Sequence, residues 1–148
     1  MNFLIRPMEI ADYDAALALW RNTPGIGLNA VDDSRAGIEK YLQRNPGTSF
    51  VAVGDGVIAG TILAGHDGRR GFLCHACVAG EARRRGVGTR LAQHALAALR
   101  REGISKVALV VFGNNGDGNA FWEKMGMAVR TDLAYRDKAL VDLSRIDP

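Results

Sequence analysis

The chain has 148 residues, of which 47% are hydrophobic and 24% are charged, and its net charge is +3. This length and composition predict one domain, residues 1–148, with one sizeable core, and they exclude a disordered chain. No apolar run approaches the ~18 residues of a membrane-spanning helix, and the N-terminus lacks the regions of a secretory signal peptide. We therefore expect a cytoplasmic protein without a membrane partner.

The first third of the chain predicts an edge strand and two helices. Residues 2–6 form a short apolar run that ends at a proline, which is typical of an edge strand. Asp12 is a candidate N-cap of the first helix. The apolar face of that helix consists of Tyr13, Ala16, Leu17 and Trp20. Asp33 or Ser34 would cap a second helix, which ends before the turn at residues 45–47.

The middle of the chain predicts three consecutive antiparallel strands. Residues 50–53 and 57–64 flank the dipeptide Asp55-Gly56, which supplies the positive φ angles of a tight hairpin turn. A second turn at residues 66–69 leads into a third strand at residues 72–78.

The last part of the chain predicts helices and strands in alternation. The most strongly amphipathic helix ends at Gly103, and residues 107–112 form an apolar run typical of a strand buried on both faces. A short helix at residues 118–125 precedes two strands at residues 127–130 and 135–143. The expected order is β-α-α-β-β-β-α-β-α-β-β, a mixed α/β (α+β) sheet flanked by helices.

A basic, glycine-containing loop joins the third of the consecutive strands to the amphipathic helix. Arg83, Arg84 and Arg85 precede Gly86 and Gly88. The first turn of a helix has free N–H groups and a partial positive charge, and glycines let a ligand approach the backbone closely. The loop therefore indicates a phosphate-rich ligand. In the alternative interpretation, the glycines only ease the entry of the helix and the arginines are solvated.

The class of phosphate ligand is narrowed by two missing features. The loop lacks the lysine of the ATP-binding P-loop. It also lacks the third glycine of the dinucleotide fingerprint, because Leu91 stands at that position. ATP hydrolysis and NAD binding are thus disfavoured, which leaves a pyrophosphate carried by another cofactor.

Two motifs resemble the GNAT superfamily of N-acetyltransferases. Arg83-x-x-Gly86-x-Gly88 is similar to the acyl-CoA-binding pattern of that family, in which Gln or Arg precedes two spaced small residues. Residues 115–127 resemble the family segment Asn-x-x-x-x-x-x-Tyr-Glu-Lys-x-Gly-Phe. The expected order of elements also matches the family fold, so the resemblance covers nearly the whole chain.

The resemblance implies a splayed, mostly antiparallel sheet that holds acetyl-CoA as a co-substrate, with no metal. The cofactor would lie where the strand ending at Val78 parts from the strand beginning near Val107. The implied cofactor-binding residues are Cys77, Val78, Arg83, Arg84, Arg85, Gly86, Val87, Gly88, Thr89, Asn115, Asn119 and Trp122.

The implied reaction transfers an acetyl group to a primary amine of a small molecule or a protein. A backbone N–H group near Val78 would stabilise the oxyanion. Trp122 replaces the tyrosine that serves as general acid in many relatives. The candidates for a base are His75 and Asp67. Strand alternation points His75 away from the face of Cys74 unless a bulge re-aims it, and the turn explains Asp67 completely.

Other functions remain open from the residues alone. Cys74 and Cys77 form a Cys-x-x-Cys pair, but alternation along a strand places them on opposite faces, which favours small buried side chains over a redox pair. A non-catalytic acyl-CoA sensor would keep the same cofactor loop. A nucleic-acid-binding domain would need a second basic cluster besides Arg83–Arg85. Residues 127–143 are a candidate homodimer contact.

Overall fold

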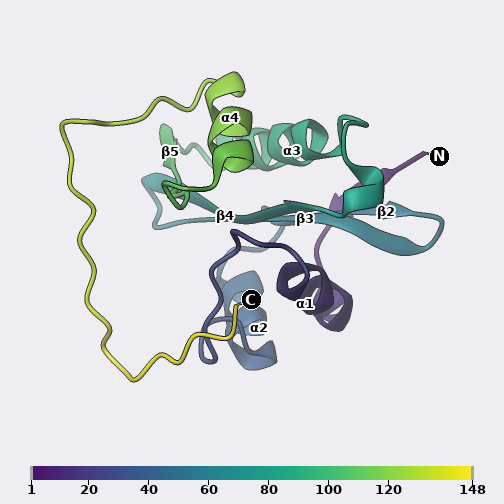
Figure 1. Cartoon of the computed structure of the whole chain (residues 1–148), viewed down its shortest axis with the longest axis horizontal. Helices are drawn as coiled ribbons and strands as arrows, with labels where there is room; N and C mark the ends of the chain where they lie inside the picture. The colour runs from purple at the N-terminus through teal and green to yellow at the C-terminus, as the bar shows by residue number, and fades with distance from the viewer. Residues whose placement is uncertain (1, 148) are drawn as a thin grey trace.

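A five-stranded sheet forms the middle layer of the protein in the computed structural model, which describes residues 2–147 (Figure 1). The strands are neighbours in chain order: β1 (Leu4–Pro7), β2 (Phe50–Gly54), β3 (Val57–His66), β4 (Arg70–Val78) and β5 (Lys106–Ala108). The first four strands are antiparallel, and β5 is parallel to β4. The sequence therefore predicted the three consecutive strands of the middle region correctly.

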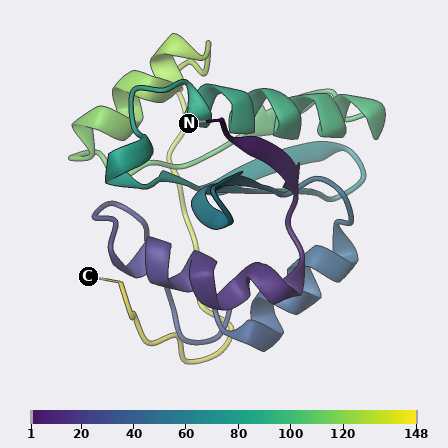
Figure 2. The ribbon, with the colours of Figure 1, turned by 90° about the vertical axis from the view of Figure 1, so that its right-hand side faces the viewer.

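Helices cover both faces of the sheet (Figure 2). One face carries α1 (Tyr13–Arg21) and α2 (Arg35–Arg44), and the other carries α3 (Val87–Arg101) and α4 (Gly116–Lys124). Two single 3₁₀ turns, η1 (Ile10–Asp12) and η2 (Gly80–Ala82), precede α1 and α3. Each face has its own apolar core. Trp20 and Ile38 are central on the α1–α2 side, and Leu91 and Leu99 on the α3 side.

Local hydrogen bonds explain where the helices and turns begin and end. Ser34 caps α2, because its Oγ accepts from the N–H of Gly37 at 3.0 Å. Asp12 stands before α1 but does not cap it, since its carboxylate accepts from Arg6 and from the N–H of Glu9. Asp55 and Gly56 have φ angles of +50° and +74°, as the predicted hairpin turn requires.

The two strands predicted at residues 127–130 and 135–143 are absent from the described part of the chain. After α4 the chain leaves the body in an open loop and returns to the loop before α2 (Figure 1). The predicted strand at residues 107–112 is also shorter, because β5 ends at Ala108 and Val110 is 57% exposed. A strand needs a partner edge for its hydrogen bonds, and β5 offers an edge of only three residues.

The last described residues are tied to the loop between α1 and α2. Asn29 and Arg145 form an isolated antiparallel bridge. The N–H of Ala30 donates to the carbonyl of Ser144 at 2.9 Å, and the N–H of Ile146 donates to that of Leu28 at 3.0 Å.

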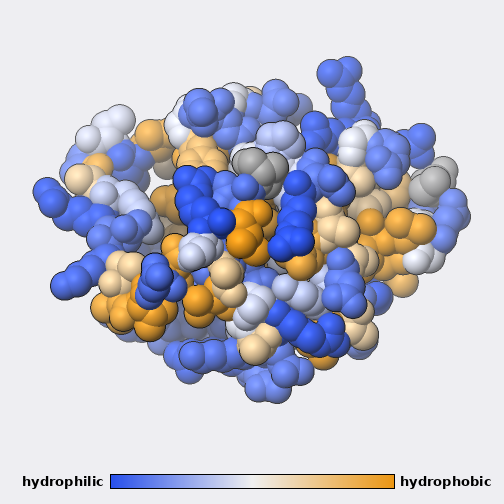
Figure 3. Space-filling view, turned by 60° about the horizontal axis from the view of Figure 1, so that its bottom comes forward, coloured by the Kyte–Doolittle hydropathy of each residue, from blue (hydrophilic) through white to orange (hydrophobic). Residues whose placement is uncertain are grey.

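The outer surface on the α1–α2 side carries small hydrophobic patches between hydrophilic side chains (Figure 3). None of the helices in residues 2–147 is long and apolar enough to cross a membrane.

Candidate active site

A cleft of about 960 Å³ opens where β4 and β5 part. β5 pairs only with residues 70–72, so the remainder of β4 has no partner strand on that side. The cleft is bounded by the end of β4, the start of α3, the start of α4 and the loop after α1. This is the splayed arrangement that the resemblance to the family implied.

Ten of the twelve cofactor-binding residues predicted from the sequence line this cleft. They are Cys77, Val78, Arg83, Arg84, Gly86, Val87, Gly88, Thr89, Asn115 and Trp122. Arg85 and Asn119 do not line it. Arg85 is exposed, and the amide of Asn119 donates to the carbonyls of Phe112 and Asn115, at 3.0 and 2.8 Å.

The loop before α3 exposes backbone N–H groups to the cleft. Gly86 is the N-cap, with φ +76° and no side-chain cap. The first helical bond runs from the N–H of Arg90 to the carbonyl of Gly86 at 3.1 Å, so the N–H groups of residues 87–89 precede it. A Cβ on Gly88 would lie 3.3 Å from the Phe121 ring, so this glycine lets α3 pass close to α4. The result is an uncapped helix start, the kind of position at which proteins often bind anions, with Arg83 and Arg84 beside it.

The opposite wall is the start of α4. Asn115 caps this helix by accepting from the N–H of Gly118 at 3.0 Å, which places the helix start two residues earlier than predicted. The Trp122 side chain is buried and packs edge-on against Phe121, with ring centroids 4.8 Å apart.

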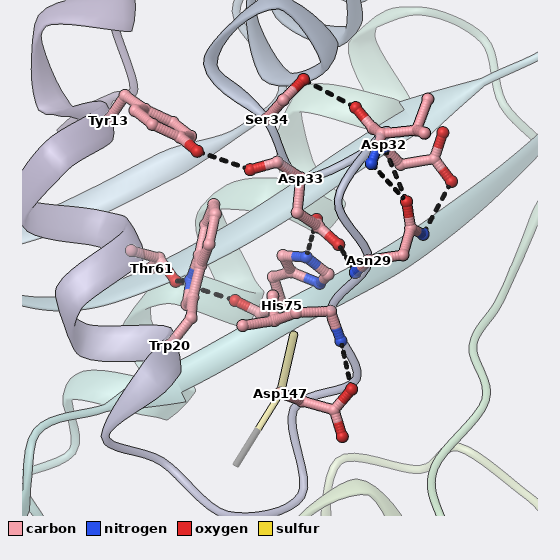
Figure 4. Close-up of polar contacts among 11 residues, drawn as sticks. Tyr13, Trp20, Asn29, Asp32, Asp33, Ser34, Thr61, His75 and Asp147 are labelled. Carbon is pink, nitrogen blue, oxygen red and sulfur yellow. Dashed lines mark hydrogen bonds and ion pairs between the residues drawn. The ribbon is translucent and has the colours of Figure 1, made fainter. Parts of the chain in front are cut away.

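A bulge in β4 turns the side chain of His75 to the face of the sheet that α1 and α2 cover. Cys74 pairs with Leu63 and Cys77 pairs with Thr61, so three steps along β4 face two along β3. His75 takes the extra position with φ +50°. Cys74 and Cys77 therefore lie on one face, toward the core of α1 and α2, and the prediction that they point to opposite faces was wrong. His75 shares that face, where it meets Trp20 (Figure 4).

The imidazole of His75 forms a buried ion pair with Asp33. Its Nε2 lies 2.6 Å from Asp33 Oδ1, and the side chains are 13% and 7% exposed. Burial alone would lower the pKa of His75, but hydrogen bonds and charge interactions with Asp33 and Cys74 raise it to about 9. His75 is thus an imidazolium at neutral pH.

Neither candidate for a base reaches the cleft. His75 does not line it. Asp67 lies in the exposed turn after β3, where its Oδ1 accepts from the N–H groups of Arg69 and Arg70, both at 2.8 Å. Hydrogen bonds from these backbone groups lower the pKa of Asp67, so it stays ionised and bonded to its own turn.

A model of the acetyltransferase (GNAT) family matches residues 14–127 of the chain. The chain belongs to the GNAT acetyltransferase family. This GNAT enzyme is 27% identical over 138 residues to an acetyltransferase of Sodalis glossinidius, a match that covers 93% of this chain and 96% of the relative. It is 29% identical over 121 residues to an acetyltransferase of Pectobacterium atrosepticum, covering 82% and 84%.

Solved structures share the fold of this GNAT enzyme. The PaiA N-acetyltransferase of Thermoplasma acidophilum in complex with coenzyme A matches with a TM-score of 0.74 and 19% identity, over 84% of this chain and 89% of that one. The aminoglycoside acetyltransferase AAC(6')-Iy with a bisubstrate analogue matches with a TM-score of 0.70 and 20% identity, over 94% and 100%.

From the sequence we expected residues 21–33 to govern the choice of acceptor, but no residue of the loop after α1 was predicted to line the GNAT cofactor cleft. Thr23, Pro24 and Gly25 line the cleft, and Thr23 Oγ1 accepts from Cys77 Sγ at 3.0 Å. A Thr-Pro-Gly sequence indicates only a turn, because nothing local shows which strand the turn meets. Within residues 2–147, no group of three or more His, Cys, Asp or Glu side chains is placed to hold a metal ion.

Proposed function

We propose that the cleft binds acetyl-CoA and that the enzyme transfers the acetyl group to a primary amine of a small molecule or a protein. The observation that carries this proposal is the uncapped start of α3 beside the unpaired end of β4, in a chain of the GNAT family. The coenzyme A complex of PaiA and the bisubstrate complex of AAC(6')-Iy, both of this fold, support it.

The residues of the cleft divide between the two ends of the cofactor. The N–H groups of Val87, Gly88 and Thr89 would bind the pyrophosphate, and the arginines at positions 83–85 would add positive charge. A Cβ on Gly86 would meet no atom within 4 Å, so a ligand has room against that backbone. The free edge of β4 would hold the pantetheine arm by backbone hydrogen bonds.

Proton transfer in this cleft relies on few side chains. The titratable residues that line it are Cys77, Arg83, Arg84 and Asp117. Burial raises the pKa of the Cys77 thiol, which keeps it neutral. We propose that the acceptor amine loses its proton to water before it attacks, and that water protonates the departing thiolate in place of the missing tyrosine.

Acetyl transfer is tested by following the release of the coenzyme A thiol from acetyl-CoA with a panel of primary amines. The expected result is thiol release that depends on one class of amine, together with an acetylated product detected by mass spectrometry. Binding of acetyl-CoA without turnover on any amine would favour the sensor alternative instead.

We also propose that the protein acts in the cytoplasm, because its two cysteines are free thiols, as in a reducing compartment.

A further proposal is that two copies associate through residues 127–143. Leu133, Tyr135 and Leu140 are each more than 60% exposed there, which is unusual for apolar side chains without a partner. Light scattering after size-exclusion chromatography tests this, and a monomer at all protein concentrations would contradict it.

A further inference from the structure

The loop between α1 and α2, residues 22–34, is fastened to β4 at two points. Near its start, Cys77 Sγ donates to Thr23 Oγ1 at 3.0 Å. At its end, His75 Nε2 lies 2.6 Å from Asp33 Oδ1. Because Thr23–Gly25 line the cleft, any movement of this loop changes one wall of the cleft.

Neighbouring elements fix both partners of the second contact (Figure 4). Thr61 Oγ1 donates to the carbonyl of His75 at 2.8 Å and accepts from Trp20 Nε1 at 2.8 Å. The Trp20 ring also stands edge-on to the imidazole, with centroids 4.6 Å apart. A positive φ is uncommon for a residue other than glycine, and these contacts hold His75 in that conformation.

Asp33 is held just as firmly. Its second carboxylate oxygen accepts from the N–H of Asn29 at 2.8 Å, and its carbonyl accepts from the Tyr13 hydroxyl at 2.6 Å. Asn29 lies within the same loop, so the carboxylate organises the loop and binds β4 at once. Breaking one half of a buried ion pair leaves the other charge uncompensated, so this contact is costly to open.

These observations show that His75 does not line the cleft, although the residues that follow it in the sequence do. Its Nε2 is engaged by Asp33 and its ring does not line the cleft, whereas Ala76 and Cys77, which follow it, do. A general base needs a free nitrogen within reach of the acceptor. His75 therefore acts through the residues that it holds in place.

We propose that His75 is a positioning residue: its imidazolium, paired with Asp33 beside Trp20, latches the α1–α2 loop onto the bulge of β4 and fixes the loop wall of the cleft. Deprotonation of the imidazole removes the charge that holds the latch, so the loop loosens at alkaline pH. The latch follows from the contacts alone, and its effect on acetyl-CoA rests on the function proposed above.

The titratable groups near the latch come from four parts of the chain. They are Tyr13 of α1, Asp32 and Asp33 of the loop, Cys74 and Cys77 of β4, and Asp147, which accepts from the N–H of Leu28 at 3.3 Å. Cysteine-to-serine variants remove each thiol while His75 stays in place. The proposal requires that Cys74→Ser and Cys77→Ser keep the alkaline transition and that His75→Gln lose it.

Two measurements on the free protein test the latch. The first follows the imidazole resonances of His75 by NMR between pH 5 and pH 10. The pKa of His75 is expected to lie well above the ordinary imidazole value of 6.5, and in Asp33→Asn it is expected to fall toward 6.5. A wild-type His75 that titrates at or below 6.5 overturns the proposal without any variant.

The second measurement is hydrogen exchange of peptides that cover residues 22–34, corrected for the intrinsic effect of pH. Wild type and the control His94→Gln are expected to protect the loop at pH 7 and to lose about tenfold of that protection at pH 9.5. His75→Gln should exchange fast at both values. Equal protection in His75→Gln and wild type contradicts the latch.

A coenzyme A titration then separates the latch from the proposed function. If the latch shapes the cleft, His75→Gln binds coenzyme A several-fold more weakly at pH 7 than His94→Gln does. Failure of the wild type to bind coenzyme A would defeat the proposed function and leave the NMR and exchange results standing.

Discussion

At the scale of single residues, the pair of His75 and Asp33 joins positions 42 residues apart in the chain. Removing two charges from water is costly, and the cost is offset only where the remaining hydrogen-bonding capacity is satisfied. Here the second oxygen of Asp33 accepts from Asn29, and within the described residues no buried side-chain nitrogen or oxygen lacks a partner. The pair is thus complete, and removing one member should be far more damaging than changing an exposed histidine.

The stability of the fold should depend on the protonation of His75. Its pKa is raised to about 9 in the folded protein, from an ordinary value of 6.5, so its contribution is full below pH 6.5 and is lost as pH rises through 9. The loss corresponds to an order of 3 kcal/mol. Denaturant unfolding of wild type and His75→Gln between pH 6 and pH 10 measures it. A variant that shows the same decline as wild type over this range would refute the assignment.

A substitution at Trp122 tests whether an acidic side chain at this position helps to protonate the departing thiolate. Trp122→Tyr places a phenol, which is a stronger acid than an indole N–H, on the wall of the proposed cleft. We expect turnover to stay equal or to rise, with acetyl-CoA binding retained. A large fall in kcat with intact binding would show that the indole itself is required.

At the scale of elements, the N-termini of α3 and α2 differ in how their first N–H groups are satisfied. α3 begins with open N–H groups and no side-chain cap, which leaves them for a ligand, whereas α2 begins with the capping hydroxyl of Ser34. The two starts therefore differ: the N–H groups of α3 are open to the cleft, whereas Ser34 satisfies an N–H group of α2.

Ser34→Ala is expected to lower the free energy of unfolding by about 1 kcal/mol, because the N–H of Gly37 loses its acceptor. Ser105→Ala, at an exposed serine, is the matched control and should change stability much less. Equal effects of the two substitutions in denaturant unfolding would mean that the cap contributes nothing measurable.

Elements with strong local signals could be predicted from the sequence, and those that depend on distant partners could not. The arginine and glycine pattern before α3 predicted the loop that lines one side of the cleft, and Asp55-Gly56 predicted the hairpin. The bulge at His75 depends on the register between two strands, which alternation within one strand does not reveal. Residues 127–143 have apolar side chains but no partner edge, so their composition suggested strands that the structure lacks.

At the scale of the whole molecule, the loop between α1 and α2 connects two distant parts of the chain. It meets β4 at two points, through Thr23 and Asp33, and it meets residues 144–146 through Leu28 and Ala30. The loop before α3 and the loop after α1 thus line the same cleft, and the proposed latch fastens the second of them to β4.

The most direct test of the central claim is calorimetric titration of acetyl-CoA into wild type, Gly86→Glu and Gly47→Glu. Gly86 and Gly47 are both exposed, have φ angles of +76° and +78°, and offer open space for a side chain, but only Gly86 lines the cleft. The control therefore matches the backbone strain and the added charge. We expect wild type and Gly47→Glu to bind acetyl-CoA and Gly86→Glu to lose binding while it remains folded. Equal affinity in the two variants would contradict the assignment of this cleft as the acetyl-CoA site.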